Sequence, residues 1–381
     1  MALILKEILK KSREQYQLTL IAGSAGINNY VSWIYITEDI NNTDFLRGNE
    51  LIITTGMLLK NEETLFHFIK TMHSHNCSGI ILNIGKYIHK PDISQSILLY
   101  CDNKKIPLFL MPWEIHISDV MQDYCLQISR QLQKNDIVTL AFQSAISSPD
   151  DKNHYIPALI QNGFELNGTY RIVIIYGLFN ITRIRSFLTS YVKSFFVFPY
   201  ETNCIIVFQT IDNILLQKII SDFFILLQKR IQSTTTIGIG NEVTSLTSLH
   251  TSYRQADFAL HYALFYQKSY STFNQLGIFQ IFSQFTNIQL LESMYKQQLG
   301  KLEEYDKKNH SEYMETLRYY ITNNGSIQKT AQCSATHRNT INYRIQKIKS
   351  ILEIDLSSIE NLFQLFLAFY IKDYLNLKKD L

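Results

Sequence analysis

The sequence is poor in charged residues. They make up 18% of the 381 residues, and 36 lysines and arginines stand against 33 aspartates and glutamates, which gives a formal net charge of +3. A charge of this size, spread over such a length, excludes a chain that binds polyanions over its whole surface. If the chain binds nucleic acid, its basic residues must be concentrated in one segment.

Cysteines and long apolar runs are also scarce. The five cysteines are scattered and form no CxxC pair, which favours an intracellular protein with reduced thiols. No apolar run approaches the roughly 18 to 20 residues that span a bilayer. The first residues include Lys6, Glu7 and Lys10 and lack the apolar stretch of a secretory signal. We therefore expect a cytoplasmic protein with no membrane partner.

Apolar residues are abundant, at 46%, and Tyr and Phe number 23 each. This composition excludes a mostly disordered chain, and the length predicts two or three domains. The aromatic residues are spread through apolar patterns, which is typical of core positions.

Short apolar runs alternate with helical patterns in the first third. An opening helix to about Tyr16 and a helix at about 62–75 are expected, with strands at 18–22, 30–37, 50–54, 79–84 and 107–111. Such alternation predicts an α/β domain in which helices cover a buried sheet.

A long helical pattern at about 118–145 leads to a Ser-Ser-Pro-Asp-Asp linker at 147–151. The middle third then alternates again. Its predicted strands are 170–176, 194–199, 204–210 and 235–240, and its predicted helices are 181–193, 212–231 and 248–267. All six prolines lie at or before Pro199, and from about Asn287 the pattern is almost wholly helical.

The basic residues are concentrated near the C-terminus. Residues 318–350 contain no acidic side chain and six basic ones, namely Arg318, Lys329, Arg338, Arg344, Lys347 and Lys349. A segment with this imbalance is suited to contact a phosphate backbone, although short charged runs are often only solvated faces.

The same segment has the layout of a helix-turn-helix. Ser326 can cap a short helix to about Cys333, and Thr336 or His337 can cap a second helix to about Leu352. Ala331 is a small residue suited to a close helix crossing, and one face of the second helix is apolar, with Ile341, Ile345, Ile348 and Leu352. The alternative interpretation is a two-helix corner with a solvated outer face.

The other face of the second helix has the side chains that read DNA. We expect the phosphate contacts to come from Lys329, Arg344, Lys347 and Lys349. We expect the residues at or near base edges to be Thr336, His337, Arg338, Asn339, Asn342 and Tyr343.

The runs 326–332 and 337–345, the second of which reads His-Arg-Asn-Thr-Ile-Asn-Tyr-Arg-Ile, resemble the C-terminal helix-turn-helix of the PucR family of bacterial transcription regulators. Residues 31–34, 48–56, 77–81 and 106–108 resemble the N-terminal PucR domain of that family. Ser334 and Thr336 depart from the family pattern, which has apolar residues there. The resemblance implies a cytoplasmic regulator that senses a small metabolite, often linked to purine or other nitrogen metabolism.

Residues 237–240 and 252–257 resemble the degenerate GGDEF-like domain of the same regulators. True GGDEF cyclases carry a glycine pair and metal-binding carboxylates on the central hairpin. The corresponding residues 198–203 read Phe-Pro-Tyr-Glu-Thr-Asn, with no glycine and a single acid. The sequence therefore predicts no catalytic residue, no cofactor and no enzymatic activity.

Two groups of residues are candidates for binding a small ligand or a metal ion. Glu50, Thr54 and Thr55 lie at a predicted strand end and could contact an effector, as α/β sheets often bind ligands there. Trp33 and Arg47 are further candidates. A buried strand with a polar turn is the alternative. His73, His75 and Cys77 alternate as metal ligands would, but a helix end is the favoured interpretation, so no metal site is predicted.

The expected architecture is an α/β sensor domain at 1–128, a helical linker at 129–165, an α/β degenerate GGDEF-like domain at 166–285 and an all-α helix-turn-helix domain at 286–381, with the motif at about 326–352. The expected partners are a double-stranded DNA operator, a small-molecule effector and further copies of the chain in a homodimer or higher homo-oligomer, because helix-turn-helix proteins usually bind two half-sites. The alternative function is a metabolite-binding or interaction protein whose helix-turn-helix no longer binds DNA.

Overall fold

The computed structural model describes residues 3–40, 43–177, 179–228 and 235–379. The chain divides into two compact units, Met1–Ser144 with Asp151–Phe164 and Ala145–Asp150 with Glu165–Leu381. No helix in these described ranges is both long and apolar enough to cross a membrane.

The first unit is built on a five-stranded sheet of order β2-β7-β6-β5-β4, in which β4 to β7 are parallel and β2 is antiparallel to β7. The strands are β1 (Leu3–Ile4), β2 (Thr19–Ala22), β3 (Tyr30–Val31), β4 (Trp33–Ile36), β5 (Glu50–Thr54), β6 (Gly79–Ile84) and β7 (Leu108–Pro112). The helices are α1 (Leu5–Ser12), α2 (Glu62–Ser74), α3 (Gln95–Lys104), α4 (Ile117–Ser147) and α5 (Lys152–Gln161).

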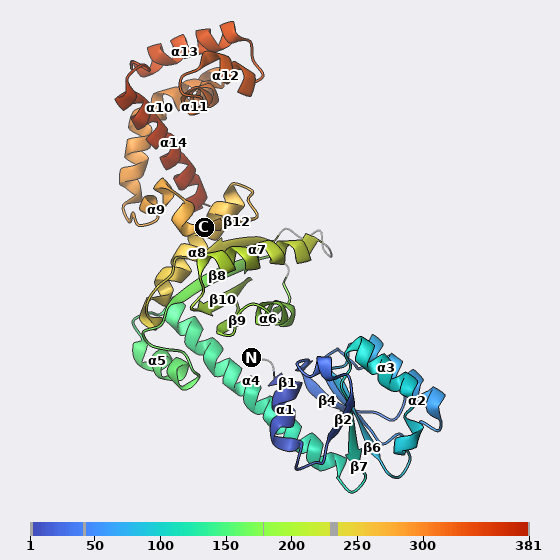
Figure 1. Cartoon of the computed structure of the whole chain (residues 1–381). Helices are drawn as coiled ribbons and strands as arrows, with labels where there is room; N and C mark the ends of the chain where they lie inside the picture. Colours follow the sequence, from blue (N-terminus) through green and yellow to red (C-terminus); the bar gives the residue numbers. More distant parts are fainter. Residues whose placement is uncertain (1–2, 41–42, 178, 229–234, 380–381) are drawn as a thin grey trace. The chain divides into compact units, whose positions relative to one another are not determined.

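Helices lie on both faces of this sheet (Figure 1), and alternate residues of its strands enter separate cores on the two faces. Ile52 and Ile80 pack with α2 and α3, whereas Leu51 and Ile81 pack with α1 and α4. The sheet is thus covered on both faces, as the apolar strands predict.

Two boundaries in this unit differ from expectation. The opening helix ends at Ser12 rather than near Tyr16, because the chain turns into β2 at Gln17, whose φ of 48° is left-handed. The strand expected at 30–37 is split at Ser32, so that β3 pairs with β1 and β4 pairs with β5.

The middle region is a second α/β layer, with sheet order β12-β11-β8-β10-β9. Its strands are β8 (Tyr170–Tyr176), β9 (Phe195–Tyr200), β10 (Asn203–Gln209), β11 (Thr236–Ile239) and β12 (Tyr270–Thr272). Its helices are α6 (Ile181–Thr189), α7 (Asn213–Gln228) and α8 (Leu249–Phe265). The last residues of the helix expected at 212–231 lie outside the described residues.

Helices α6 and α7 share a core with one face of this sheet, and α8 packs closely on the other. Gly238 and Gly240 make that approach possible, because a Cβ added to them would lie 2.1 Å from the carbonyl oxygens of Ala256 and Ser252, respectively. The Gly-Ile-Gly run is therefore a packing feature of β11.

The last region is helical, as expected, with α9 (Ile278–Phe282), α10 (Ile288–Asn309), α11 (Tyr313–Thr322), α12 (Ile327–Cys333), α13 (Arg338–Leu352) and α14 (Ile359–Lys379). One core joins these helices and also includes Phe258 and Ala259 of α8. The helical region and the end of the middle region thus share packing within the second unit.

Candidate nucleic-acid interface

The helix-turn-helix geometry begins with two side-chain caps. The Ser326 Oγ accepts a hydrogen bond from the Lys329 amide at 3.3 Å and starts α12. The His337 Nδ1 accepts from the Asn339 amide at 3.2 Å and starts α13. Between them Ala335 takes a φ of 49°, which turns the chain. The predicted helix bounds and the Ser326 cap are confirmed, and of the two residues expected to cap the second helix it is His337 that does so.

Helix α13 is seated by its apolar face. Ile341, Ile345 and Ile348 are at most 2% exposed, and they lie in one core with Leu317 of α11 and Ala331 of α12. This burial fixes which side of α13 faces solvent. The small side chain of Ala331 sits in this shared core, as the sequence predicts for a close crossing.

The predicted DNA-contacting residues divide by exposure. Those that are exposed are Lys329, His337, Arg338, Asn339, Asn342 and Tyr343. Those that are half-buried are Thr336, Arg344, Lys347 and Lys349. The exposed set places an arginine, two asparagine amides and a phenol along one side of α13, which suits hydrogen bonding to base edges.

Arg344 is held by protein groups instead of projecting freely. Its guanidinium donates to the Thr316 Oγ1 at 3.1 Å and lies 3.5 Å from a carboxylate oxygen of Glu312. Thr316 is 1% exposed, so this contact ties α13 to α11. Lys347 lies 5.9 Å from the centre of the Tyr305 ring of α10.

Arg318, the first basic residue of the segment, also has its charge balanced within the protein. Its two terminal nitrogens donate to the two carboxylate oxygens of Asp373 on α14, at 3.0 and 2.6 Å. The Tyr266 hydroxyl donates to the same carboxylate at 2.8 Å. Hydrogen bonding to Asp373 raises the pKa of the Arg318 guanidinium above its ordinary value. The excess of basic residues therefore overstates the charge available to a phosphate backbone.

The sequence pattern did not identify Asp373, which is 5% exposed and joins α8, α11 and α14 through these contacts. Its signal was a lone acid in the mostly apolar run 362–377, since a carboxylate buried among apolar side chains needs a partner.

Ser334 and Thr336, which depart from the family pattern, have local partners. The Ser334 hydroxyl donates to the Thr330 carbonyl at 2.8 Å, and the Thr336 hydroxyl donates to the Ser334 carbonyl at 2.9 Å. Both hydroxyls are thereby satisfied within the turn, so neither leaves an unpaired polar group against the core.

The predicted effector-contacting residues lie at two ends of β5. Trp33 pairs with Glu50 at the amino end, where the Glu50 carboxylate accepts from the amides of Arg47 and Gly48 at 2.8 and 2.9 Å. Thr54 lies four residues along the strand, about 13 Å at ordinary strand rise. We expected Glu50, Thr54 and Thr55 at one strand end, but in the structure Glu50 begins β5 and Thr54 ends it.

Glu38 organises the carboxyl end of β5 and was missed by the sequence pattern. Its carboxylate accepts from the Thr54 hydroxyl at 3.0 Å and from the amides of Thr55 and Met57 at 2.7 and 3.1 Å. Its distance in sequence from this loop left no local signal.

The other candidate residues have structural contacts. His75 ends α2, and its Nδ1 lies 2.9 Å from the Thr71 carbonyl oxygen, while His73 pairs with the Tyr100 hydroxyl at 3.2 Å. Cys77 is buried, and burial raises its pKa to about 12. Within the described ranges, no three His, Cys, Asp or Glu side chains gather as a metal site would require.

The β9–β10 hairpin turns at Glu201, its single acid.

Comparison with known proteins identifies all three regions. Residues 7–128 match the purine catabolism regulatory protein-like family, residues 161–262 match the GGDEF-like domain, and residues 313–371 match the PucR C-terminal helix-turn-helix domain. The chain belongs to the PucR family.

Three relatives from Bacillus subtilis (strain 168) are similar to parts of this PucR-family chain. The DNA-binding transcriptional activator AdeR is 32% identical over 96 residues, or 25% of this chain and 23% of AdeR. The proline-responsive transcriptional activator PutR is 27% identical over 196 residues, or 48% of this chain and 47% of PutR. The purine catabolism regulatory protein is 30% identical over 103 residues, or 27% and 19%. Each match spans less than half of the relative's length.

Proposed function

We propose that this protein is a sequence-specific DNA-binding transcriptional regulator that responds to a small metabolite of purine, amino-acid or other nitrogen metabolism. The observation that supports this most is the exposed face of α13, where Arg338, Asn339 and Asn342 project from a helix seated by three buried isoleucines. The relatives' descriptions as transcriptional activators and a catabolism regulator agree with this role. The test is salt-dependent binding to the DNA upstream of its own or a neighbouring gene.

Replacing Arg338 or Asn339 by alanine should weaken operator binding by about 1 to 3 kcal/mol, or about 5- to 150-fold, and relax the sequence preference. Lys329→Gln should instead weaken all sequences alike and reduce the salt slope by about 1. Fluorescence anisotropy with operator and scrambled duplexes measures both effects. Lys308→Gln, an exposed charge change on α10, is the control. Unchanged operator binding in both α13 variants would contradict the recognition-helix assignment.

The second candidate function is a metabolite-binding or interaction protein that does not bind DNA. It is favoured by one observation, that Arg318 and Arg344 are held by Asp373, Glu312 and Thr316 and so contribute less to a phosphate contact. Absence of salt-dependent binding to upstream DNA would select this candidate.

We further propose that the protein acts in the cytoplasm as a homodimer. The domain boundaries proposed are 1–128, 129–165, 166–285 and 286–381.

Dimerisation is supported by the apolar side chains that α4 exposes on one side, Leu126, Ile137 and Leu140, which are 48%, 52% and 63% exposed. A row of large exposed apolar side chains on a helix is typical of an association surface.

Ile137→Glu combined with Leu140→Glu should weaken self-association by about 100-fold or more, because carboxylates in an apolar interface lose their hydration. Sedimentation equilibrium of the full chain measures the change. The matched control is Leu132→Glu, since Leu132 is also 52% exposed but lies on another side of α4. A dimer of ordinary strength in the double variant would exclude this surface.

We propose that the effector contacts the carboxyl end of β5, at Thr54, Thr55 and Glu38, and that Trp33, Arg47 and Glu50 form a separate, structural cluster. The hydrogen bonds of Glu50 to the loop before β5 support that separation.

We also propose that the middle domain is not a cyclase, since its hairpin has one acid and no glycine pair. Incubation with GTP and Mg²⁺ should yield no cyclic dinucleotide by mass spectrometry, and detection of one would overturn this proposal.

A further inference from the structure

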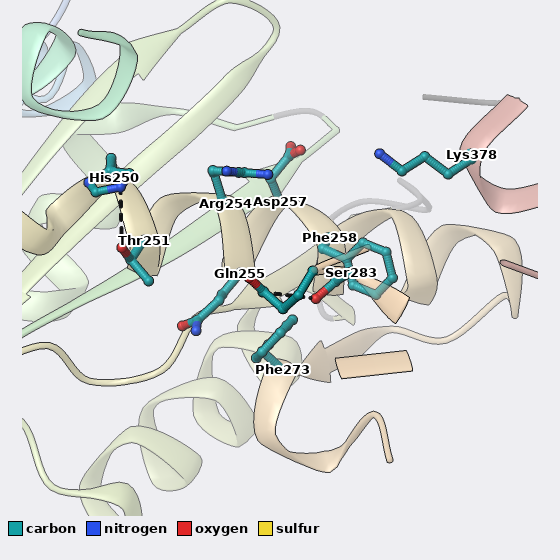
Figure 2. A pocket seen from close by; sticks show the side chains of 10 residues that line it. His250, Thr251, Arg254, Gln255, Asp257, Phe258, Phe273, Ser283 and Lys378 are labelled. Atoms are coloured by element: carbon teal, nitrogen blue, oxygen red, sulfur yellow. Dashed lines mark hydrogen bonds between the residues drawn. The ribbon is translucent and has the colours of Figure 1, made fainter. Parts of the chain in front are cut away.

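A cavity of about 320 Å³ lies within the second unit, between α8, the segment 273–284 and the C-terminal end of α14 (Figure 2). Its volume falls at the lower end of the range for small-molecule sites. The residues that line it include Arg254 and Asp257 from α8 and Lys378 from α14. In Figure 2 the Lys378 ammonium points toward the side of α8 that carries Arg254 and Asp257.

The two cations at this cavity share one carboxylate in its lining, that of Asp257, with which Lys378 interacts electrostatically. Arg254 and Lys378 are exposed, and neither has a hydrogen bond or ion pair among the residues that the structure describes. Asp257 lies 3.7 Å from the Nδ1 of His261, its neighbour on α8. The charged lining of two cations and one carboxylate sums to +1, so a monoanion would leave the cavity neutral, whereas a dianion would leave it negative.

Further groups could orient a ligand. The Gln255 Oε1 accepts from the Asn241 amide at 3.1 Å, which leaves its side-chain N–H groups free to face the cavity that it lines. The His250 Nδ1 is buried and has no hydrogen-bond partner within the described part of the chain. Phe258 and Phe273, with ring centres 6.2 Å apart, supply an apolar wall.

The run Ser252–Asp257 divides into residues that build the fold and residues that face this cavity. Ser252 is fully buried, and its Oγ accepts from the Ile172 amide at 3.0 Å and donates to the Asn241 carbonyl at 2.7 Å. Ala256 packs on Gly238. Arg254 is exposed and lines the cavity, so its guanidinium is available to a ligand there.

We propose that this cavity binds a small organic monocarboxylate, with its carboxylate between Arg254 and Lys378 and its apolar body against Phe258 and Phe273. The planar guanidinium of Arg254 suits a carboxylate, and the ammonium of Lys378 adds a second charge. Because Phe258 and α14 lie in the same core as α13, the ligand would join the middle domain to the recognition helix. This regulatory role rests on the proposed DNA binding, but the ligand site itself does not.

The test is isothermal titration calorimetry of the full chain with benzoate as probe, beside inorganic phosphate and benzylamine. Benzoate should bind saturably, phosphate should bind about tenfold more weakly, and benzylamine should not bind. Arg254→Gln and Lys378→Gln should each weaken benzoate binding about tenfold, and Asp257→Asn should strengthen it. Lys379→Gln, which makes the same charge change one residue beyond the lining, should bind as the unaltered protein does.

The proposal is overturned if benzoate shows no saturable binding, if Arg254→Gln binds like the unaltered protein, or if Lys379→Gln loses as much affinity as Lys378→Gln. Tighter binding of phosphate than of benzoate would reject the monocarboxylate class. Operator binding is measured separately. A protein that binds benzoate but no DNA would therefore refute the proposed function and leave the site standing, and the reverse result would refute only the site.

Discussion

Replacing Gly238 by alanine should lower the free energy of unfolding of the middle region by about 3 kcal/mol, the upper end of ordinary overpacking costs. The added Cβ would lie 2.1 Å from the Ala256 carbonyl oxygen and 2.5 Å from the Leu260 amide nitrogen. These are backbone atoms of α8, so no side-chain rotation relieves the contact. The helix must move away from β11 and β8, which opens the core between them.

Hydrogen exchange followed by mass spectrometry measures this change locally, which matters because a chain of several domains does not unfold in one step. Peptides of β8, β11 and α8 should lose protection, while peptides of β5 and β6 in the first unit should not. The control is Gly300→Ala in the middle of α10, where the nearest atom to an added Cβ is 3.7 Å away. That variant should gain about 0.5 to 1 kcal/mol from helix propensity. Equal protection in Gly238→Ala and the unaltered protein would show that α8 does not depend on this glycine.

Much of the fold follows from the sequence where a pattern is local. The predicted strands of the two five-stranded sheets, the long helix α4 and the helix-turn-helix are confirmed because each has a periodic apolar face or a cap close in sequence, whereas β12 was not predicted. Helix α3 had no such signal. Only Ile97 and Cys101 are buried within it, and its other residues give no amphipathic face.

The candidate site was predictable in its position but not in its charge balance. The turn, the caps and the exposed face of α13 follow from residues 326–352. Which cations remain free does not, because the partners of Arg318 and Arg344 are supplied by α14 and α11, 55 and 28 residues away in sequence. The separation of Glu50 from Thr54, by contrast, already follows from the predicted strand at 50–54, whose two ends they occupy.

Asp373→Asn should destabilise the helical region by about 2 to 3 kcal/mol, because it weakens charge-assisted hydrogen bonds at a nearly buried position. The carboxylate accepts hydrogen bonds from both terminal nitrogens of Arg318 and from the Tyr266 hydroxyl, and Asp373 is 5% exposed. The neutral amide carries one oxygen, so one Arg318 nitrogen would face an N–H group. Exchange protection should fall in α11 and α14, and Glu360→Gln, in the exposed first turn of α14, should change stability by less than about 0.5 kcal/mol.

A double variant tests whether the cost comes from the unpaired charge. Asp373→Leu alone leaves the Arg318 guanidinium without its carboxylate partner. Combining it with Arg318→Met should therefore recover part of the lost stability, since removing both charges of such a pair is less costly than removing one. Arg318 keeps 43% of its side chain exposed, so solvent limits the penalty and the recovery should be about 1 kcal/mol. Additive losses in the double variant would mean that the two residues stabilise α11 and α14 independently. The contact between Arg318 and Asp373 would then not be what holds α11, against which α13 packs, to α14.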